Sequence, residues 1–227
     1  MNCHPKLSKR ERPLVFFVTG RKSLPGASTA DLLEKIRDAA AAGCDFVQIR
    51  EKDLSAKALL QLARDAVSAG VATGTPGLLV NDRLDVAIAA GAAGVHLGES
   101  SLAAGDVTRW CGSAHAPADF LMGVSCHGLQ EVVAAEEAGA NCVFFGPVFD
   151  TPSKRSFGLP QGLDRLREAC RLVKIPVVAI GGVDEKNAAQ CVKAGAAGIA
   201  AIRMFQQSTG VESLRTAISQ IHAVARG

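Results

Sequence analysis

The stretch AAAGCDFVQIR, residues 40–50, decides the fold, because its pattern returns three more times along the chain. Each copy joins an alanine-rich helical segment to a glycine and then to a short apolar strand. Glycine at the end of a helix adopts the left-handed conformation that stops the helix at low steric cost. The three other copies are AIAAGAAGVHLG at 87–98, AEEAGANCVFFG at 135–146 and CVKAGAAGIAAIR at 191–203.

The intervals between these copies are long enough for two strand–helix units each, so a second set of strands is expected. Apolar runs suit that role at 14–19, 77–81, 121–125 and 176–180. Helical patterns lie at 28–42, 55–71, 83–90, 102–112, 128–138, 161–173, 184–194 and 211–225. Eight apolar strands alternating with helices predict an α/β fold, a parallel sheet closed into a single (βα)8 TIM barrel. An open doubly wound sheet fits less well, because VTGRKSLPG after the first strand lacks the GxGxxG pattern.

Length and composition indicate one domain. The 227 residues are 48% hydrophobic, which suits a single barrel core, and no linker or low-complexity tract divides them. Residues 1–12 are expected to be a disordered leader, because their basic and polar character does not match a signal peptide. A single TIM-barrel domain is then expected over 13–227.

Composition also excludes several classes of partner. A net charge of +3, 4% aromatic residues and no tyrosine argue against nucleic acid. The apolar runs are shorter than the roughly 20 residues that a membrane helix needs, so no membrane segment is expected.

Seven scattered cysteines without a CxxC motif indicate reduced thiols in a cytoplasmic protein. The sequence leaves open whether copies of the chain form a homo-oligomer.

Polar residues gather where the expected strands end, and barrel active sites lie at the C-terminal ends of the strands. Alternation with a period of two places Gln48, Arg50 and Lys52 on the face that reaches the mouth of the barrel. A structural layer of salt bridges is the alternative interpretation. With Lys154 and Arg203 added, the mouth holds four cations, which would repel one another without an anionic ligand. A phosphorylated or pyrophosphorylated substrate is therefore expected.

Two loops offer phosphate contacts. Gly181 and Gly182 would expose backbone amides just before a helix expected to begin near Asp184, although a glycine pair also suits a simple tight turn. The second loop follows the strand in VFFGPVFDTPSKRSFG. It supplies hydroxyls and a point charge suited to phosphate from Thr151, Ser153 and Lys154.

Three further residues each have two interpretations. Asp82, beside Asn81, suits either a Mg²⁺ ligand or the N-cap of the following helix. His96, between apolar neighbours, suits either a core histidine or a substrate contact. His127, at a strand–helix junction, suits either a capping and orienting role or a functional one.

Seven segments resemble, in order and at similar spacing over 14–205, the signature series of thiamine phosphate synthase and the related thiazole tautomerase. They are VQIREK, LLVNDRLDVA, GVHLGES, GVSCH, GPVFDTPSK, VVAIGGV and AGIAAI. The resemblance implies an enzyme of thiamine biosynthesis that joins 4-amino-2-methyl-5-(diphosphomethyl)pyrimidine to a thiazole phosphate, with Mg²⁺. In that family, pyrophosphate departs and leaves a pyrimidine-methyl cation, which the thiazole nitrogen captures.

The resemblance also implies roles, position by position. The pyrimidine diphosphate would be held by Gln48, Arg50, Lys52, Asn81, Ser125 and Lys154. The thiazole phosphate would be held by Thr151, Ser153, Gly182 and the backbone near Ile202. The same motifs add His96, Gly181 and Arg203 to the substrate-binding residues. Catalysis would involve Arg50, Lys52, Lys154 and His127, and Asp82 would ligate Mg²⁺.

Two positions depart from the family pattern. The family's HLGQxD reads HLGESS here, so Ser101 stands where the family has its second Mg²⁺ ligand, and Glu99 is a substitute from another position. Arg203 stands where the family usually has serine. The alternatives are a metal-independent tautomerase with His127 as general acid and base, or a phosphate-binding paralogue without synthase activity. The intact NDR and REK motifs favour the synthase.

Overall fold

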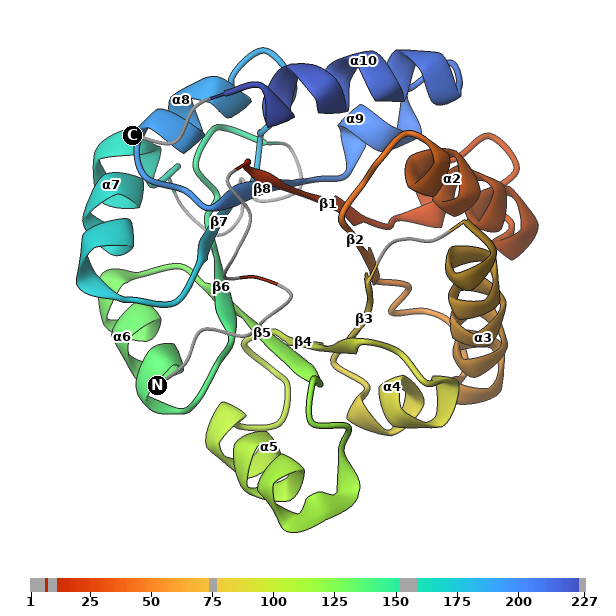
Figure 1. Cartoon of the computed structure of the whole chain (residues 1–227), viewed down its shortest axis with the longest axis horizontal. Helices are drawn as coiled ribbons and strands as arrows, with labels where there is room; N and C mark the ends of the chain where they lie inside the picture. Colours follow the sequence, from red (N-terminus) through yellow and green to blue (C-terminus); the bar gives the residue numbers. More distant parts are fainter. Residues whose placement is uncertain (1–6, 8–11, 74–76, 152–158, 225–227) are drawn as a thin grey trace.

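The computed structural model describes residues 7, 12–73, 77–151 and 159–224, which build a closed barrel. Eight parallel strands follow one another in chain order, and β8 pairs with β1 to close the barrel (Figure 1). The strands are β1 (Leu14–Val18), β2 (Phe46–Ile49), β3 (Gly77–Asn81), β4 (Gly94–Leu97), β5 (Leu121–Cys126), β6 (Cys142–Phe145), β7 (Val177–Ile180) and β8 (Gly198–Ala201). The predicted (βα)8 TIM barrel is confirmed.

Helices surround the strands on the outside of the barrel (Figure 1). The α-helices are α2 (Thr29–Ala41), α3 (Ala56–Thr73), α4 (Leu84–Ala90), α5 (Ala104–Trp110), α6 (Leu129–Glu137), α7 (Gly162–Leu172), α8 (Ala188–Lys193), α9 (Arg203–Gln206) and α10 (Val211–His222). Two short helical turns are η1 (Arg21–Ser23) and η2 (Cys111–His115). The short helix α9 was not expected from the sequence.

The helix predicted over 184–194 begins later, at Ala188. The side chain of Asp184 accepts hydrogen bonds from two backbone N–H groups that follow it, at 3.0 and 3.2 Å. The side chain of Asn187 accepts from the Asp184 N–H and donates to the Gly182 carbonyl, both at 2.9 Å. These side-chain bonds hold the backbone in a turn that delays the helix. The glycine pair is therefore not followed directly by a helix N-terminus, and that expectation was wrong.

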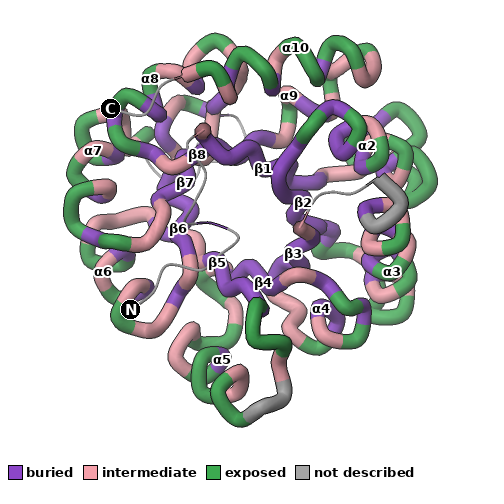
Figure 2. The backbone as a smooth tube through the Cα atoms, viewed as in Figure 1, coloured by how far each residue is buried: buried purple, intermediate pink, exposed green. Residues whose placement is uncertain are grey.

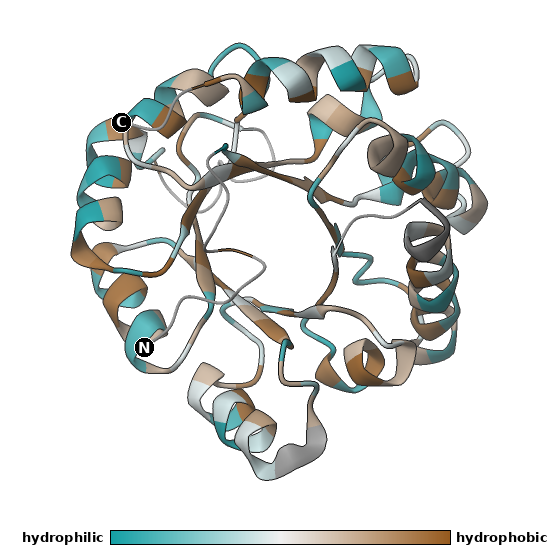
Figure 3. Ribbon diagram, viewed as in Figure 1, coloured by the Kyte–Doolittle hydropathy of each residue, from teal (hydrophilic) through white to brown (hydrophobic). Residues whose placement is uncertain are grey.

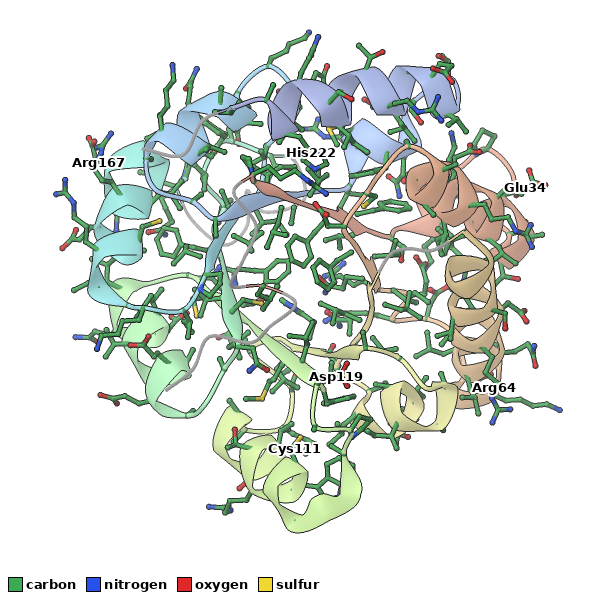
Figure 4. All side chains as sticks on the ribbon, in the orientation of Figure 1. Glu34, Arg64, Cys111, Asp119, Arg167 and His222 are labelled. Carbon is green, nitrogen blue, oxygen red and sulfur yellow. The ribbon has the colours of Figure 1, made fainter. Side chains whose placement is uncertain are left out.

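Two apolar layers stabilise the barrel. The strands are buried along their length, while the helices expose their outer faces (Figure 2), which are also the more hydrophilic ones (Figure 3). Side chains fill the space inside the barrel (Figure 4). Phe16 stacks on Phe46 with ring centroids 4.7 Å apart and meets the edge of Phe144 at 5.0 Å. Leu7, from the expected leader, is 2% exposed and packs in this interior cluster, whereas 1–6 and 8–11 lie outside the described residues.

Within the described ranges, no helix is both long enough and apolar enough to cross a bilayer. The six cysteines that these ranges contain are free thiols, and four of them are buried. Burial raises the pKa of the Cys44 thiol to about 12, so this side chain stays protonated and behaves as a small apolar group.

An ion pair between the partly exposed Arg12 and the buried Asp45 joins the segment before β1 to the barrel. Asp45, just before β2, accepts two hydrogen bonds from Arg12, at 2.8 and 3.0 Å, and one from the Val15 N–H at 2.9 Å. Its side chain is 1% exposed, and His222 at the end of α10 lies 3.3 Å away. The contacts hold the first residues of the domain, β1 and α10 together at the N-terminal end of the barrel.

Asp45→Asn is expected to lower the free energy of unfolding by about 2 kcal/mol, because an amide cannot replace a carboxylate that accepts from several donors. Urea denaturation measures the loss. The control is Asp164→Asn, which removes the exposed partner of Arg167 on the outer face of α7 (Figure 4). That variant should change stability by less than about 0.5 kcal/mol. Equal losses in the two variants would contradict the assignment.

Candidate active site

Four polar side chains from neighbouring strands form a layer at the C-terminal end of the barrel interior. Gln48 at the end of β2 donates through Nε2 to Asn81 Oδ1 on β3 at 2.9 Å. His96 on β4 is paired with Asn81 in the strand register, and its Nε2 lies 2.8 Å from Ser125 Oγ on β5. The structure thus brings His96 together with Gln48, Asn81 and Ser125, the three residues of this layer that the family resemblance assigns to the pyrimidine diphosphate.

Two polar atoms in this layer are buried without a hydrogen-bond partner among the described residues. Gln48 is 2% exposed and His96 is 3% exposed, yet Gln48 Oε1 and His96 Nδ1 have no hydrogen-bond partner among the described residues. A buried polar atom left unpaired costs about 1–3 kcal/mol, so such atoms point to a ligand group as the missing partner. The polar layer has the character of a binding surface, in addition to its place in the core.

His96 is held in its neutral form. Burial lowers the pKa of His96 to about 3, and the charge of Asp82, which raises the pKa, is opposed by the charge of Arg50, which lowers it. The ring also meets Phe144 edge-on, with centroids 4.5 Å apart. The burial of His96 supports the core interpretation, while a substrate contact stays a prediction.

The two cations after β2 lie at the mouth. Arg50 is exposed, and its guanidinium has no hydrogen-bond or ion-pair partner within the described part of the chain. Lys52 is also exposed, and its Nζ lies 3.4 Å from Asp82 Oδ2, across β3. Arg203, the first residue of α9, is exposed after β8. Lys154, the fourth expected cation, lies outside the described residues.

Asp82 does not cap the helix that follows it. Residue 83 occupies the N-cap position of α4, and no side chain caps that end. Asp82 instead has a left-handed backbone, with φ of 63°, and its carboxylate accepts hydrogen bonds from Ser101 Oγ and from Asn81 Nδ2, the latter at 2.6 Å. The Gly98 N–H donates to the same carboxylate at 3.3 Å. Of the two sequence interpretations, the capping one was wrong.

The surroundings of Asp82 stabilise the charged form of its carboxylate. Burial alone would raise the pKa of Asp82, but the hydrogen bond from Ser101 and the charge of Lys52 outweigh it, so the pKa lies below its usual value. Ser101, and not the exposed Glu99, is the residue of the HLGESS segment that contacts Asp82. Among the described residues, no three histidine, cysteine or acidic side chains gather closely enough to hold a metal by themselves.

Two hydrogen bonds fix the position of His127. Its Nδ1–H donates to the Gly146 carbonyl at 2.5 Å, and its backbone N–H donates to Glu131 Oε2 at 2.6 Å. The first bond joins the residue after β5 to the end of β6, and the second joins it to α6. The capping and orienting interpretation is supported, while an acid–base role stays a prediction.

The glycine pair after β7 packs tightly against the loop after β6. Gly181 and Gly182 have φ of 90° and 69°, and a Cβ on Gly182 would lie 2.7 Å from the Asp150 carbonyl oxygen. The Phe149 N–H donates to the Gly181 carbonyl at 2.9 Å. Close backbone approach therefore requires both glycines. This packing holds Thr151, which is 8% exposed, at the barrel mouth, whereas Ser153 lies outside the described residues.

Two buried polar residues at the mouth were not expected from the sequence. Thr19, directly after β1, is 0% exposed, and Glu51, between the two cations of the REK motif, is 5% exposed. Thr19 Oγ1 donates to Glu51 Oε1 at 2.7 Å. A threonine that follows an apolar run, and a glutamate between two basic residues, are the weak sequence signals for this contact.

Comparison with known proteins shows the family to which this barrel belongs. The family model described as thiamine monophosphate synthase matches residues 15–205, which is most of the chain. The chain belongs to the thiamine monophosphate synthase family. The family resemblance noted in the sequence is thus confirmed.

Relatives of this family match most of the chain. A Geobacter sulfurreducens protein, named provisionally as a thiamine-phosphate synthase, is 44% identical over 188 residues, 83% of this chain and 84% of its own length. The thiamine-phosphate synthase of Roseiflexus castenholzii is 36% identical, over 93% of this chain and 89% of its own. The solved thiamine phosphate pyrophosphorylase of Pyrococcus furiosus has a TM-score of 0.79 at 28% identity, covering 97% of this chain and 99% of that one.

Proposed function

We propose that the barrel mouth joins 4-amino-2-methyl-5-(diphosphomethyl)pyrimidine to a thiazole phosphate and releases pyrophosphate, with Mg²⁺. The chain is a thiamine-phosphate synthase, a transferase of thiamine biosynthesis. The observation that carries the proposal is the buried Gln48 Oε1, which has no partner among the described residues, in a polar layer whose Asn81 contacts Asp82, the partner of the exposed Lys52. An amino group of the substrate would donate to Gln48 Oε1, a diphosphate would bind the exposed cations, and a divalent cation would bind the Asp82 carboxylate.

The pyrimidine side of the site uses the polar layer. Gln48 Oε1 accepts from the exocyclic amino group, and Ser125, oriented by the neutral His96, faces the diphosphate. Arg50 and Lys52 bind the diphosphate oxygens, and Lys154 joins them from the loop after β6. As the carbon–oxygen bond breaks and the thiazole nitrogen forms the new carbon–nitrogen bond, these cations stabilise the charge that builds on pyrophosphate.

The donor set at Asp82 fits Mg²⁺. A carboxylate with a lowered pKa and the Ser101 hydroxyl are hard oxygen ligands, and Mg²⁺ in such sites takes one or two carboxylates together with substrate phosphates. Bound Mg²⁺ would supply further charge stabilisation to the leaving pyrophosphate. Lys52, 3.4 Å from the same carboxylate, would hold the diphosphate next to it.

The thiazole phosphate occupies the opposite side of the mouth. Thr151 and Ser153 supply hydroxyls, and the turn of Gly181 and Gly182 packs against Phe149 and Asp150, just before Thr151. Arg203 and the backbone at Ile202, where α9 begins after β8, supply the remaining phosphate contacts. The guanidinium of Arg203 offers this phosphate a stronger partner than a hydroxyl does.

The test is a synthase assay. Purified protein is mixed with the two substrates in the presence of Mg²⁺ and then of EDTA, and thiamine phosphate and pyrophosphate are quantified. Metal-dependent formation of both products is expected. If the diphosphate stays intact while the protein converts a carboxythiazole phosphate without metal, the synthase assignment is wrong and the tautomerase is correct.

His127→Ala is expected to lower kcat of the synthase reaction by less than about tenfold, because His127 orients the loop after β6 and transfers no proton in the mechanism above. Steady-state kinetics measures the effect. Near-complete loss, with a bell-shaped pH profile in the wild type that the variant lacks, would instead make His127 the general acid and base.

A further inference from the structure

The end of β1 is tied to the end of β2 by a buried side-chain network. Thr19 Oγ1 donates to Glu51 Oε1 at 2.7 Å and accepts from the Arg50 backbone N–H at 2.9 Å. The Thr19 N–H in turn donates to the Gln48 carbonyl at 2.9 Å. Thr19 therefore contacts Gln48, Arg50 and Glu51, in the segment that carries the proposed diphosphate ligands.

Glu51 anchors the other side of this network. Its two carboxylate oxygens accept from the Arg21 backbone N–H at 3.0 and 3.2 Å, and the Arg21 Nε lies 3.7 Å from Oε2. Arg21 itself donates to the Ala27 carbonyl at 2.8 Å and to Asp53 at 2.5 Å. The Glu51 side chain is 3% exposed, so its carboxylate is removed from solvent and fully committed to these donors.

The anchoring of Glu51 affects its two neighbours in the chain, Arg50 and Lys52. Glu51 is held against Thr19 and Arg21, whereas its neighbours Arg50 and Lys52 are exposed, and Lys52 Nζ lies 3.4 Å from Asp82 Oδ2. Both neighbours are exposed, and long exposed side chains take up a fixed direction only if their backbone is fixed. The Thr19–Glu51 pair supplies that constraint.

We infer that Thr19 and Glu51 are positioning residues for the diphosphate subsite, setting the direction in which Arg50 and Lys52 leave the end of β2. The inference rests on the proposed function, which assigns the diphosphate to those two cations. A positioning role and a purely electrostatic role predict opposite effects on anion binding when the charge of Glu51 is removed. Removing the negative charge of Glu51 should by itself strengthen binding of an anion, whereas loosening the two cations should weaken it.

The test measures binding of inorganic pyrophosphate with Mg²⁺ by isothermal titration calorimetry. Thr19→Val keeps the shape and removes both hydroxyl bonds, and it should weaken pyrophosphate binding by about tenfold. Thr19→Ser keeps the hydroxyl and should stay within about twofold of wild type. Glu51→Gln should also weaken binding, although it makes the mouth more positive. In steady-state kinetics, KM for the pyrimidine diphosphate should rise while KM for the thiazole phosphate stays within about twofold.

Asp53→Asn is the matched control, because it removes a carboxylate that pairs with the same Arg21 without touching Thr19 or Arg50. Its pyrophosphate affinity should equal that of the wild type. If Thr19→Val fails to fold by circular dichroism, Glu51→Gln decides the question. Unchanged or tighter pyrophosphate binding in Glu51→Gln, or an equal rise of both KM values, overturns the inference.

A parallel variant separates this inference from the proposed function. Arg50→Ala removes one of the assigned diphosphate ligands directly. If Arg50→Ala binds pyrophosphate as the wild type does, the assignment of the diphosphate subsite is wrong. If Arg50→Ala weakens binding while Thr19→Val and Glu51→Gln do not, only the positioning role fails.

Discussion

Arg50→Ala is expected to lower kcat/KM for the pyrimidine diphosphate by about 10³-fold, the largest single loss at this mouth. The guanidinium is exposed, has no hydrogen-bond or ion-pair partner among the described residues, and lies close enough to His96 to lower its pKa. A planar guanidinium binds phosphate oxygens in pairs, so its loss removes both affinity and geometry. Steady-state kinetics with each substrate varied in turn measures the loss.

Two further variants test the reason for that loss. Arg50→Lys keeps the charge and loses the paired geometry, so its kcat/KM should lie between those of Arg50→Ala and the wild type. Arg64→Ala removes an exposed arginine of α3, on the outside of the barrel (Figure 4), and should leave both constants unchanged. Activity of Arg50→Ala within about threefold of wild type would exclude Arg50 from the leaving-group site.

The barrel was predictable because its signal repeats. Each strand is a continuous apolar run, since a strand in this barrel is buried on both faces, and glycines mark helix ends such as Gly91 and Gly139. The polar layer was predictable too, because Gln48 and His96 each interrupt an apolar run and Asn81 ends one. These features depend on local sequence alone.

The rest depended on contacts between distant segments. Whether Ser101 or Glu99 stands beside Asp82 is set by how the loop after β4 folds back on β3, which neighbouring residues do not reveal. Thr19 and Glu51 meet across 32 residues of sequence, so neither shows its role by spacing. The late start of α8 depends on side-chain bonds that compete with the helix backbone, a balance that helical periodicity does not record.

Asp82→Asn is expected to raise the Mg²⁺ concentration needed for half-maximal activity by about 10²-fold, through loss of the one carboxylate in the proposed metal site. Asparagine tolerates the left-handed backbone of this position, where φ is 63°, so the variant should keep its fold. Mg²⁺ titration of activity, together with Mn²⁺ binding followed by electron paramagnetic resonance in the presence of pyrophosphate, measures the change.

Changes at Ser101 separate the charge of Asp82 from its hydrogen bonds. Ser101→Ala removes the donor to Asp82 but leaves the carboxylate, so it should alter the Mg²⁺ requirement by less than about tenfold. Ser101→Asp adds a second carboxylate beside Asp82 and should lower the requirement and tighten Mn²⁺ binding, because Mg²⁺ sites accept two such ligands. If Asp82→Asn leaves both readouts unchanged, Asp82 serves to hold Lys52 at 3.4 Å and is not a metal ligand.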